Sequence, residues 1–180
     1  MPAVERVRVL TPTGILEKDV STLPEGNRLE YYAAKQFLKL YGAVSGTRYE
    51  VDLLQDCPDV VCVPPPFYIE VATVFDLPTD APKLLGRAEG IAGVQEIHAA
   101  ITQINRILSE KATRRYGVDN CVLVIRHAVP IFSGDDFRRF IDEFLIPGNH
   151  EFSAIYLLAF LQRNGLLHLG DDLVRLFPTV

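Results

Sequence analysis

The sequence predicts a single α/β domain in which helices flank a mixed β-sheet. Its 180 residues are enough for one domain with a sizeable core. Segments typical of strands alternate with longer amphipathic patterns, and this alternation favours a layered α/β architecture. Two continuous apolar runs, 121–125 and 154–160, are typical of central strands that are covered on both faces. We therefore expect about five to seven strands in one sheet, with helices on both faces.

The first half of the chain predicts a strand, a helix and then three strands without a helix between them. Alternating charged and apolar residues indicate a strand at 4–10, and Thr11 to Gly14 form a turn. Thr22, Pro24 and Glu25 are typical of a helix start, and this helix should end at Gly42. Three strands are then expected, at 48–54, 59–63 and 67–75, with the last two separated by the prolines at 64, 65 and 66.

The second half predicts a long helix followed by strands and a shorter helix. Residues 76–93 are rich in proline and glycine, so we expect an irregular connection there. Apolar residues recur at helical spacing over 94–116. Ser133 is the expected cap of a helix at 135–145. The remaining elements are the two apolar strands already named and a closing hairpin formed by 166–169 and 173–177.

Composition restricts the class of protein. A hydrophobic share of 48% and a charged share of 23% are those of an ordinary globular domain. The sequence has no apolar run long enough to span a membrane and no signal-peptide pattern at its start, so we expect no membrane partner and a cytoplasmic location. The net charge of −5 argues against a dedicated nucleic-acid coat protein. The best basic cluster, Lys111, Arg114 and Arg115, fits a helix C-terminus.

Two carboxylates on neighbouring predicted strands are the most informative feature of the sequence. Asp59 follows Pro58, and Glu70 lies in an otherwise apolar strand. If the chain reverses near Pro65, the two side chains lie opposite or diagonal on adjacent antiparallel strands, within about 5–8 Å at Cβ. Carboxylates at that separation can share a divalent cation such as Mg²⁺. Asp52 and Asp56 remain alternatives to Asp59 if the register differs.

At these residues the chain resembles the PD-(D/E)XK nuclease superfamily, which has the restriction-endonuclease-like fold. Residues 22–126 match the core order of that family, namely helix, three-strand meander, helix and strand, and the rest of the chain adds a C-terminal helix–strand extension. Pro58-Asp59 matches the first motif element, and Glu70-Val71-Ala72 matches the second at its first position. Glu30 matches the acid of the first helix. The domain 1–180 is therefore expected to be a single restriction-endonuclease-like domain.

The resemblance implies a function as well as a fold. Asp59 and Glu70 would hold Mg²⁺, with Glu30 as a further acid of the site. Ala72 stands where the family has its lysine, and Lys111 on the next helix is the candidate for a migrated basic residue, with Gln103 as a polar alternative. The implied activity is that of a Mg²⁺-dependent nuclease, a hydrolase acting on nucleic acid. The alternative is a non-catalytic descendant that keeps the fold for binding or assembly. A homodimer is left open, because the sequence does not determine the oligomeric state.

Overall fold

The computed structural model describes residues 4–74, 94–127, 132–163 and 166–178, and these form one α/β domain around a single mixed sheet. The sheet has eight strands in the order β2-β1-β3-β4-β5-β6-β7-β8, one more than the upper limit expected from the sequence. The strands are β1 (Arg6–Thr11), β2 (Gly14–Asp19), β3 (Glu50–Leu54), β4 (Val60–Val63), β5 (Phe67–Val74), β6 (Cys121–His127), β7 (Ala154–Arg163) and β8 (Leu166–Phe177).

Strand directions divide the sheet into three parts. The hairpin β1–β2 is antiparallel, and β1 is parallel to β3. The strands β3, β4 and β5 form an antiparallel meander, as expected. The strands β5, β6 and β7 run parallel to one another, and β8 returns antiparallel to β7. The predicted order of helix, three-strand meander, helix and strand is therefore present between residues 25 and 127.

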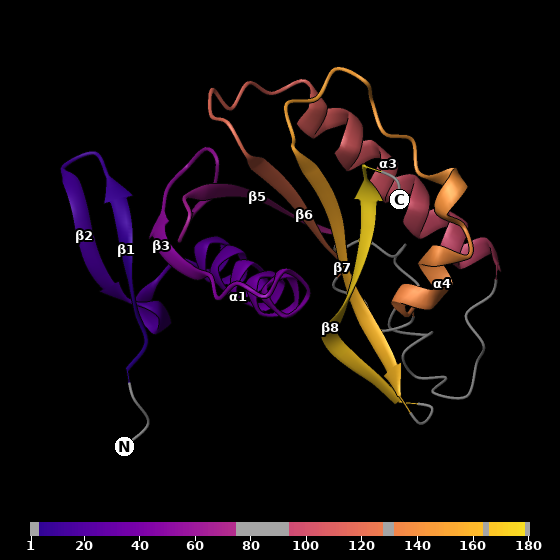
Figure 1. Cartoon of the computed structure of the whole chain (residues 1–180), viewed down its shortest axis with the longest axis horizontal. Coiled ribbons are helices and arrows are strands. Elements are labelled where there is room, and N and C mark those ends of the chain that lie inside the picture. Colours follow the sequence, from indigo (N-terminus) through magenta and orange to yellow (C-terminus); the bar gives the residue numbers. More distant parts are fainter. Residues whose placement is uncertain (1–3, 75–93, 128–131, 164–165, 179–180) are drawn as a thin grey trace.

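Helices cover both faces of the sheet, as the sequence predicts. The helix α1 (Glu25–Ser45) lies in the concave side of the curved sheet, while α3 (Val94–Ala112) and the short α4 (Gly134–Arg138) lie on the other side (Figure 1). The described ranges also contain two short 3₁₀ turns, η1 (Val20–Thr22) and η2 (Ile141–Glu143). None of the helices in these ranges is long and apolar enough to cross a membrane.

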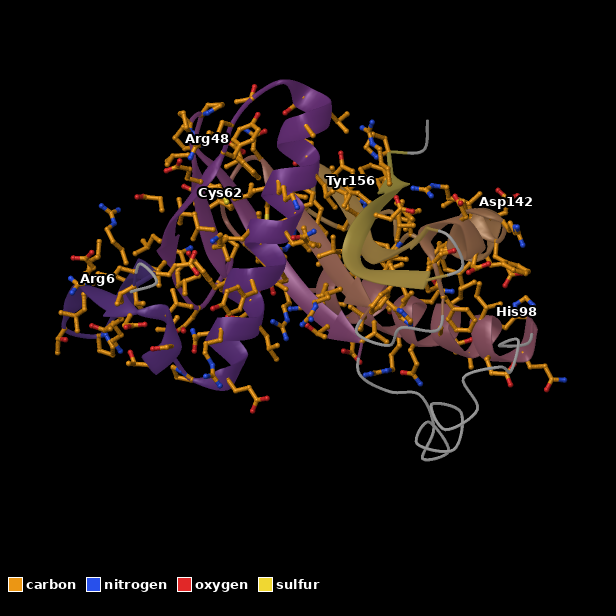
Figure 2. All side chains as sticks on the ribbon, turned by 90° about the horizontal axis from the view of Figure 1, so that it is seen from below. Arg6, Arg48, Cys62, His98, Asp142 and Tyr156 are labelled. Atoms are coloured by element: carbon orange, nitrogen blue, oxygen red, sulfur yellow. The ribbon has the colours of Figure 1, made fainter. Side chains whose placement is uncertain are left out.

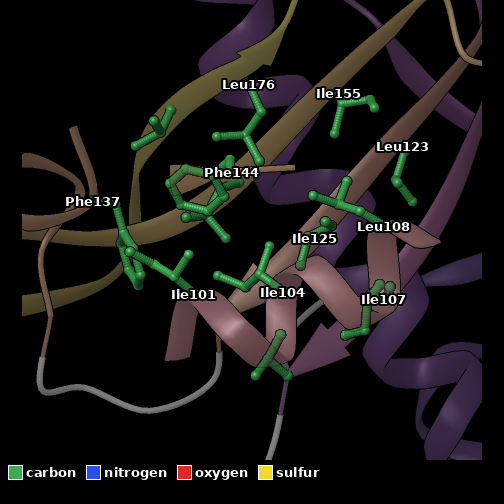
Figure 3. Packing of buried hydrophobic residues seen from close by; sticks show 14 of the residues in the cluster. Ile101, Ile104, Ile107, Leu108, Leu123, Ile125, Phe137, Phe144, Ile155 and Leu176 are labelled. Atoms are coloured by element: carbon green, nitrogen blue, oxygen red, sulfur yellow. The ribbon is translucent and has the colours of Figure 1, made fainter. Parts of the chain in front are cut away.

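Each face of the sheet has its own apolar core. On one face, Ile101, Ile104 and Leu108 of α3 pack against Leu123 and Ile125 of β6 (Figure 3). On the other face, α1 contributes Phe37 and Ala34 to a cluster that includes alternate residues of the same strands. Because side chains of a strand point alternately to the two faces, the continuous apolar run of β6 is completely buried. The predicted central strands at 121–125 and 154–160 are confirmed.

Three predicted boundaries are wrong at the N-terminal end. Residues 14–19 form β2, where no strand was expected. Pro24 rather than Thr22 is the N-terminal cap of α1, since the Thr22 hydroxyl donates to the carbonyl of Asp19 instead. The helix continues through Gly42 and ends at Gly46, whose φ of 72° is the left-handed conformation that terminates helices.

Two predictions near the C-terminus are also corrected. The helix expected at 135–145 is two short pieces, α4 and η2, although Ser133 does cap α4 through a capping box with Asp136. The closing hairpin is one long strand, β8, because residues 166–177 pair along β7 through two irregularities in register. Residues 76–93, for which an irregular connection was predicted, lie outside the described ranges.

Candidate functional site

Glu70 is a buried carboxylate in the middle of β5. It is only 1% exposed, and it pairs with Leu123 of the parallel strand β6. Tyr68 and Ala72 pack with the α3-side core, whereas Ile69 and Val71 pack with the α1-side core. This alternation, predicted from the sequence, places Glu70 on the face that α3 covers. A carboxylate in such surroundings needs a partner, because burying an unpaired charge raises the free energy of the folded state by several kcal/mol, to order of magnitude.

The partner of Glu70 is Lys111, in the last turn of α3. Its Nζ lies 2.5 Å from Oε1 of Glu70, and the side chains are 15% and 2% exposed. Position 72 of β5 is alanine, and the ammonium that reaches the carboxylate of Glu70 comes from the following helix. The second oxygen of Glu70, Oε2, is buried and has no hydrogen-bond partner among the residues that the structure describes.

Asp59 lies beside Glu70 at the start of β4. Extending the register of β4 and β5 by one residue places Asp59 opposite Glu70, which is the arrangement that the hairpin argument predicts. Its Oδ2 accepts the backbone N–H of Val71 at 2.6 Å. Burial raises the pKa of Asp59 to about 7, with the negative charge of Glu70 as the next cause. Asp59 therefore changes its charge close to neutral pH.

Glu30 approaches the same cluster from α1. Burial raises the pKa of Glu30, and the charge of Glu70 raises it further, while Lys111 acts in the opposite direction. Asp56 also raises the pKa of Glu30, so it belongs to the surroundings of the cluster. Asp52 does not belong to these surroundings, because its carboxylate forms an ion pair with Arg8 at 2.9 Å. The three acids singled out from the sequence thus influence one another electrostatically, and one alternative, Asp52, is bound elsewhere.

Three further residues surround the cluster and were not assigned to it from the sequence. Nη1 of Arg114 lies 3.6 Å from Oε1 of Glu70, and this side chain is 57% exposed. The hydroxyl of Tyr116 is buried and finds no hydrogen-bond partner in the described part of the chain. Burial, followed by the charge of Glu70, raises the pKa of Tyr116. The same two causes raise the pKa of Cys57. Only the spacing of three residues from Lys111 to Arg114 could have indicated that both cations contact one acid.

The basic cluster predicted at the helix end is therefore divided between two acids. Lys111 and Arg114 contact Glu70, whereas Arg115 pairs with Glu151 at 2.7 Å. The positive charge at the end of α3 is directed at the buried carboxylate in β5. Gln103, the polar alternative to Lys111, instead accepts a hydrogen bond from Arg106 on the same helix.

The chemistry of the donors, three carboxylates, is that which Mg²⁺ prefers. The buried oxygen Oε2 of Glu70 is an acceptor without a donor, and Asp59 and Glu30 lie within electrostatic range of it. Within the described ranges, however, no three His, Cys, Asp or Glu side chains are grouped closely enough to hold an ion by themselves. Mg²⁺ is often bound by only one or two carboxylates, with water or substrate oxygens completing the coordination, so such a site would need oxygen ligands besides these acids.

Comparisons of the chain with models of known protein families, with curated proteins and with solved structures give no match.

Proposed function

We propose that this protein is a Mg²⁺-dependent phosphodiesterase of the restriction-endonuclease-like type, in which the basic residue of the active site comes from α3. The observation that carries the proposal is the contact between Nζ of Lys111 and Oε1 of Glu70. It combines a buried acid on the third strand of a meander with an ammonium from the next helix. The element order from α1 to β6 supports the same type of fold.

The residues would have separate roles. Asp59 and Glu70, with Glu30 nearby, would hold the cation. A bound Mg²⁺ polarises a phosphate oxygen and lowers the pKa of a bound water molecule. The ammonium of Lys111 would stabilise the negative charge that develops on the phosphate, because a fixed cation in a water-poor site needs little reorganisation. The more exposed Arg114 would contact a substrate phosphate from the solvent side.

A second function is favoured by the same ion pair. Lys111 already neutralises Glu70, so the pair can act as a purely structural link between α3 and β5. In that case the protein would be a non-catalytic descendant of the fold that serves in binding or assembly. Nucleic acid as the partner, a cytoplasmic location and a homodimer remain proposals in both cases.

The experiment is a calorimetric titration of wild type, Glu70→Gln and Lys111→Ala with Mn²⁺ and Mg²⁺, together with a cleavage assay on plasmid DNA. We expect cation binding that is lost in Glu70→Gln, and weak cleavage that is lost in Glu70→Gln and strongly reduced in Lys111→Ala. Cation binding without cleavage supports the non-catalytic descendant. Cleavage that survives Glu70→Gln contradicts the assignment of the site, and cleavage unchanged in Lys111→Ala removes the lysine from it.

A further inference from the structure

A second cluster of functional groups lines a groove of about 950 Å³ between α1 and the first residues of β1 and β3. Its volume is in the range of small-molecule sites, which is about 300–1,000 Å³. The groove shares no lining residue with the Glu70 cluster. The two also lie at opposite ends of β3, since Glu50 at the start of β3 lines the groove and Asp56 follows its end. Along α1, the nine residues from Glu30 to Lys39 correspond to about 13 Å.

The groove is positively charged in a protein that is acidic overall. Its charged lining residues are four cations (Arg6, Lys35, Lys39 and Arg48) and two carboxylates (Glu5 and Glu50), in a chain of net charge −5. Arg6 and Arg48 both lie in the part of the molecule formed by α1 and the first strands, away from His98 on α3 (Figure 2). An excess of two positive charges in a concave surface attracts anions.

The ion pairs of the groove leave cationic capacity unused. Lys35 contacts Glu5, which also accepts a hydrogen bond from the hydroxyl of Tyr31, so these three side chains form one fixed network. Arg48 reaches Glu50 at 3.2 Å, but both side chains are largely exposed, so this pair is weak. Lys39 forms no hydrogen bond or ion pair with any residue that the structure describes. Lys39 is therefore free to contact a ligand, and Arg48, whose side chain is 90% exposed, can exchange its weak pair with Glu50 for one. The remaining cation, Arg6, faces Glu17 on β2 at 3.9 Å.

An aromatic ring stands beside these cations. Tyr49 is half-buried at the groove, and its ring is held by Phe67 at 5.1 Å and by Tyr41 at 5.7 Å between centroids. A ring fixed in this way can stack on a planar ligand at little cost in side-chain entropy. Proteins that bind nucleotides without reading their sequence use two kinds of contact. Cationic side chains contact the phosphates, and an aromatic side chain stacks on the base.

We infer that this groove is a nucleotide-binding site, in which Lys39 and Arg48 contact a phosphate and Tyr49 stacks on the base. The nucleotide is either free or one unit of a single strand, because both present the same phosphate and the same aromatic face. The site is separate from the Glu70 cluster and does not depend on the function proposed for that cluster. It needs neither a divalent cation nor Lys111.

The test is a binding measurement on the full chain in EDTA, with ADP, a short oligothymidylate and inorganic phosphate as probes. The chain has no tryptophan and seven tyrosines, so the difference in tyrosine-fluorescence response between wild type and Tyr49→Leu reports stacking on Tyr49, with calorimetry as the second readout. We expect Lys39→Glu and Arg48→Glu each to weaken binding by about tenfold or more, which is the size expected for a lost charge-assisted contact. Tyr49→Leu should weaken the binding of ADP and of the oligonucleotide but leave the binding of inorganic phosphate unchanged.

Matched controls separate this site from general electrostatics. Lys18→Glu makes the same change in net charge on β2, outside the groove, and should change affinity by much less. Arg106→Met, on α3 and outside both the groove and the Glu70 cluster, should leave binding intact. Tight binding of ADP alone identifies a free nucleotide as the ligand, and tight binding of the oligonucleotide identifies a strand. No binding of either probe, or an equal loss of affinity in Lys18→Glu and Lys39→Glu, would overturn the inference.

Discussion

The ammonium of Lys111 lies 2.5 Å from Oε1 of Glu70, and it reaches this carboxylate from the last turn of α3 rather than from β5. The two residues are 41 positions apart in the sequence, so the contact joins a helix to the sheet that it covers. Both side chains are largely buried. Removal of Lys111 leaves the buried carboxylate of Glu70 with only the more exposed Arg114 nearby, and removal of Glu70 leaves the ammonium of Lys111 without its acid.

The first prediction concerns the stability of this pair. Lys111→Met should lower the free energy of unfolding at pH 7 by up to about 3–5 kcal/mol, because it leaves the buried charge of Glu70 with only the more exposed Arg114, at 3.6 Å, as a partner. The double variant Lys111→Met, Glu70→Leu should recover most of that loss, because it removes both charges. Urea denaturation measures all three proteins. As a control, Arg106→Met breaks an exposed pair with Glu110 and should cost less than about 1 kcal/mol. Equal stability of the single and double variants would contradict the prediction.

The second prediction concerns pH. The pKa of Asp59 is raised from 3.8 to about 7 in the folded protein, mainly by burial. Between these values the folded state binds a proton that the unfolded state has lost, so the contribution of Asp59 to stability should decrease as the pH rises from about 4 to 7. In Asp59→Asn this pH dependence disappears, while the amide oxygen can still accept the Val71 N–H. Thermal denaturation across the pH range compares the two proteins, and identical pH profiles would show that Asp59 titrates normally.

The third prediction compares two glycines of α1. Replacement of an exposed helical glycine by alanine normally stabilises a helix by about 0.5–1 kcal/mol. Gly26 has open space around the position of an added Cβ, so Gly26→Ala should raise the melting temperature. At Gly42 the added Cβ would lie 2.6 Å from the carbonyl oxygen of Thr47, so Gly42→Ala should lower it. A rise in both variants would mean that the chain after α1 moves away from Gly42 easily.

The fourth prediction concerns the contact between α4 and β8. A Cβ at Gly134 would overlap the carboxylate of Asp172, and Arg138 holds that carboxylate through two hydrogen bonds at 2.7 and 2.8 Å. Gly134→Ala should therefore destabilise the protein in chemical denaturation. Gly148→Ala, with open space at its Cβ, is the neutral comparison. The double variant Gly134→Ala, Asp172→Ala removes the carboxylate that the new Cβ would overlap, so the overlap should be relieved. If Gly134→Ala alone is as stable as wild type, the contact between α4 and β8 is not rigid.

Sequence patterns predicted the centre of this fold better than its edges. Buried strands such as β6 produce continuous apolar runs, and the meander β3–β5 is marked by its prolines. By contrast β2 is exposed along most of its length, so it lacks the alternation that marks a half-buried strand. The sequence predicts that the helix ends at Gly42, but this glycine is needed because the carbonyl oxygen of Thr47 lies close to it. A sequence does not distinguish such a glycine from one that ends a helix through its backbone conformation.

The candidate site was predictable in its residues but not in its contacts. Glu70 stood out because an acid in an apolar strand requires a partner, and the register of a tight hairpin located Asp59 opposite it. The roles of Lys111 and Arg114 depend on how α3 lies across β5, and helical periodicity gives the face of a helix but not its position along a strand. The helix predicted over 94–116 ends at Ala112 in the structure, so Tyr116 lies beyond α3, where helical periodicity does not place its side chain. The groove beside α1 is likewise a product of tertiary packing.

The exposed hairpin at the end of the sheet has a consequence for how the molecule opens. The strand β2 has one neighbour only, and its Ile15 and Leu16 are 53% and 47% exposed, so its separation from β1 uncovers little new apolar surface. Its amide hydrogens should exchange with solvent through a local opening of low free energy, whereas those of β6, buried between β5 and β7, should exchange only when the whole domain unfolds. Cooperativity in this sheet therefore decreases from its parallel centre toward β2.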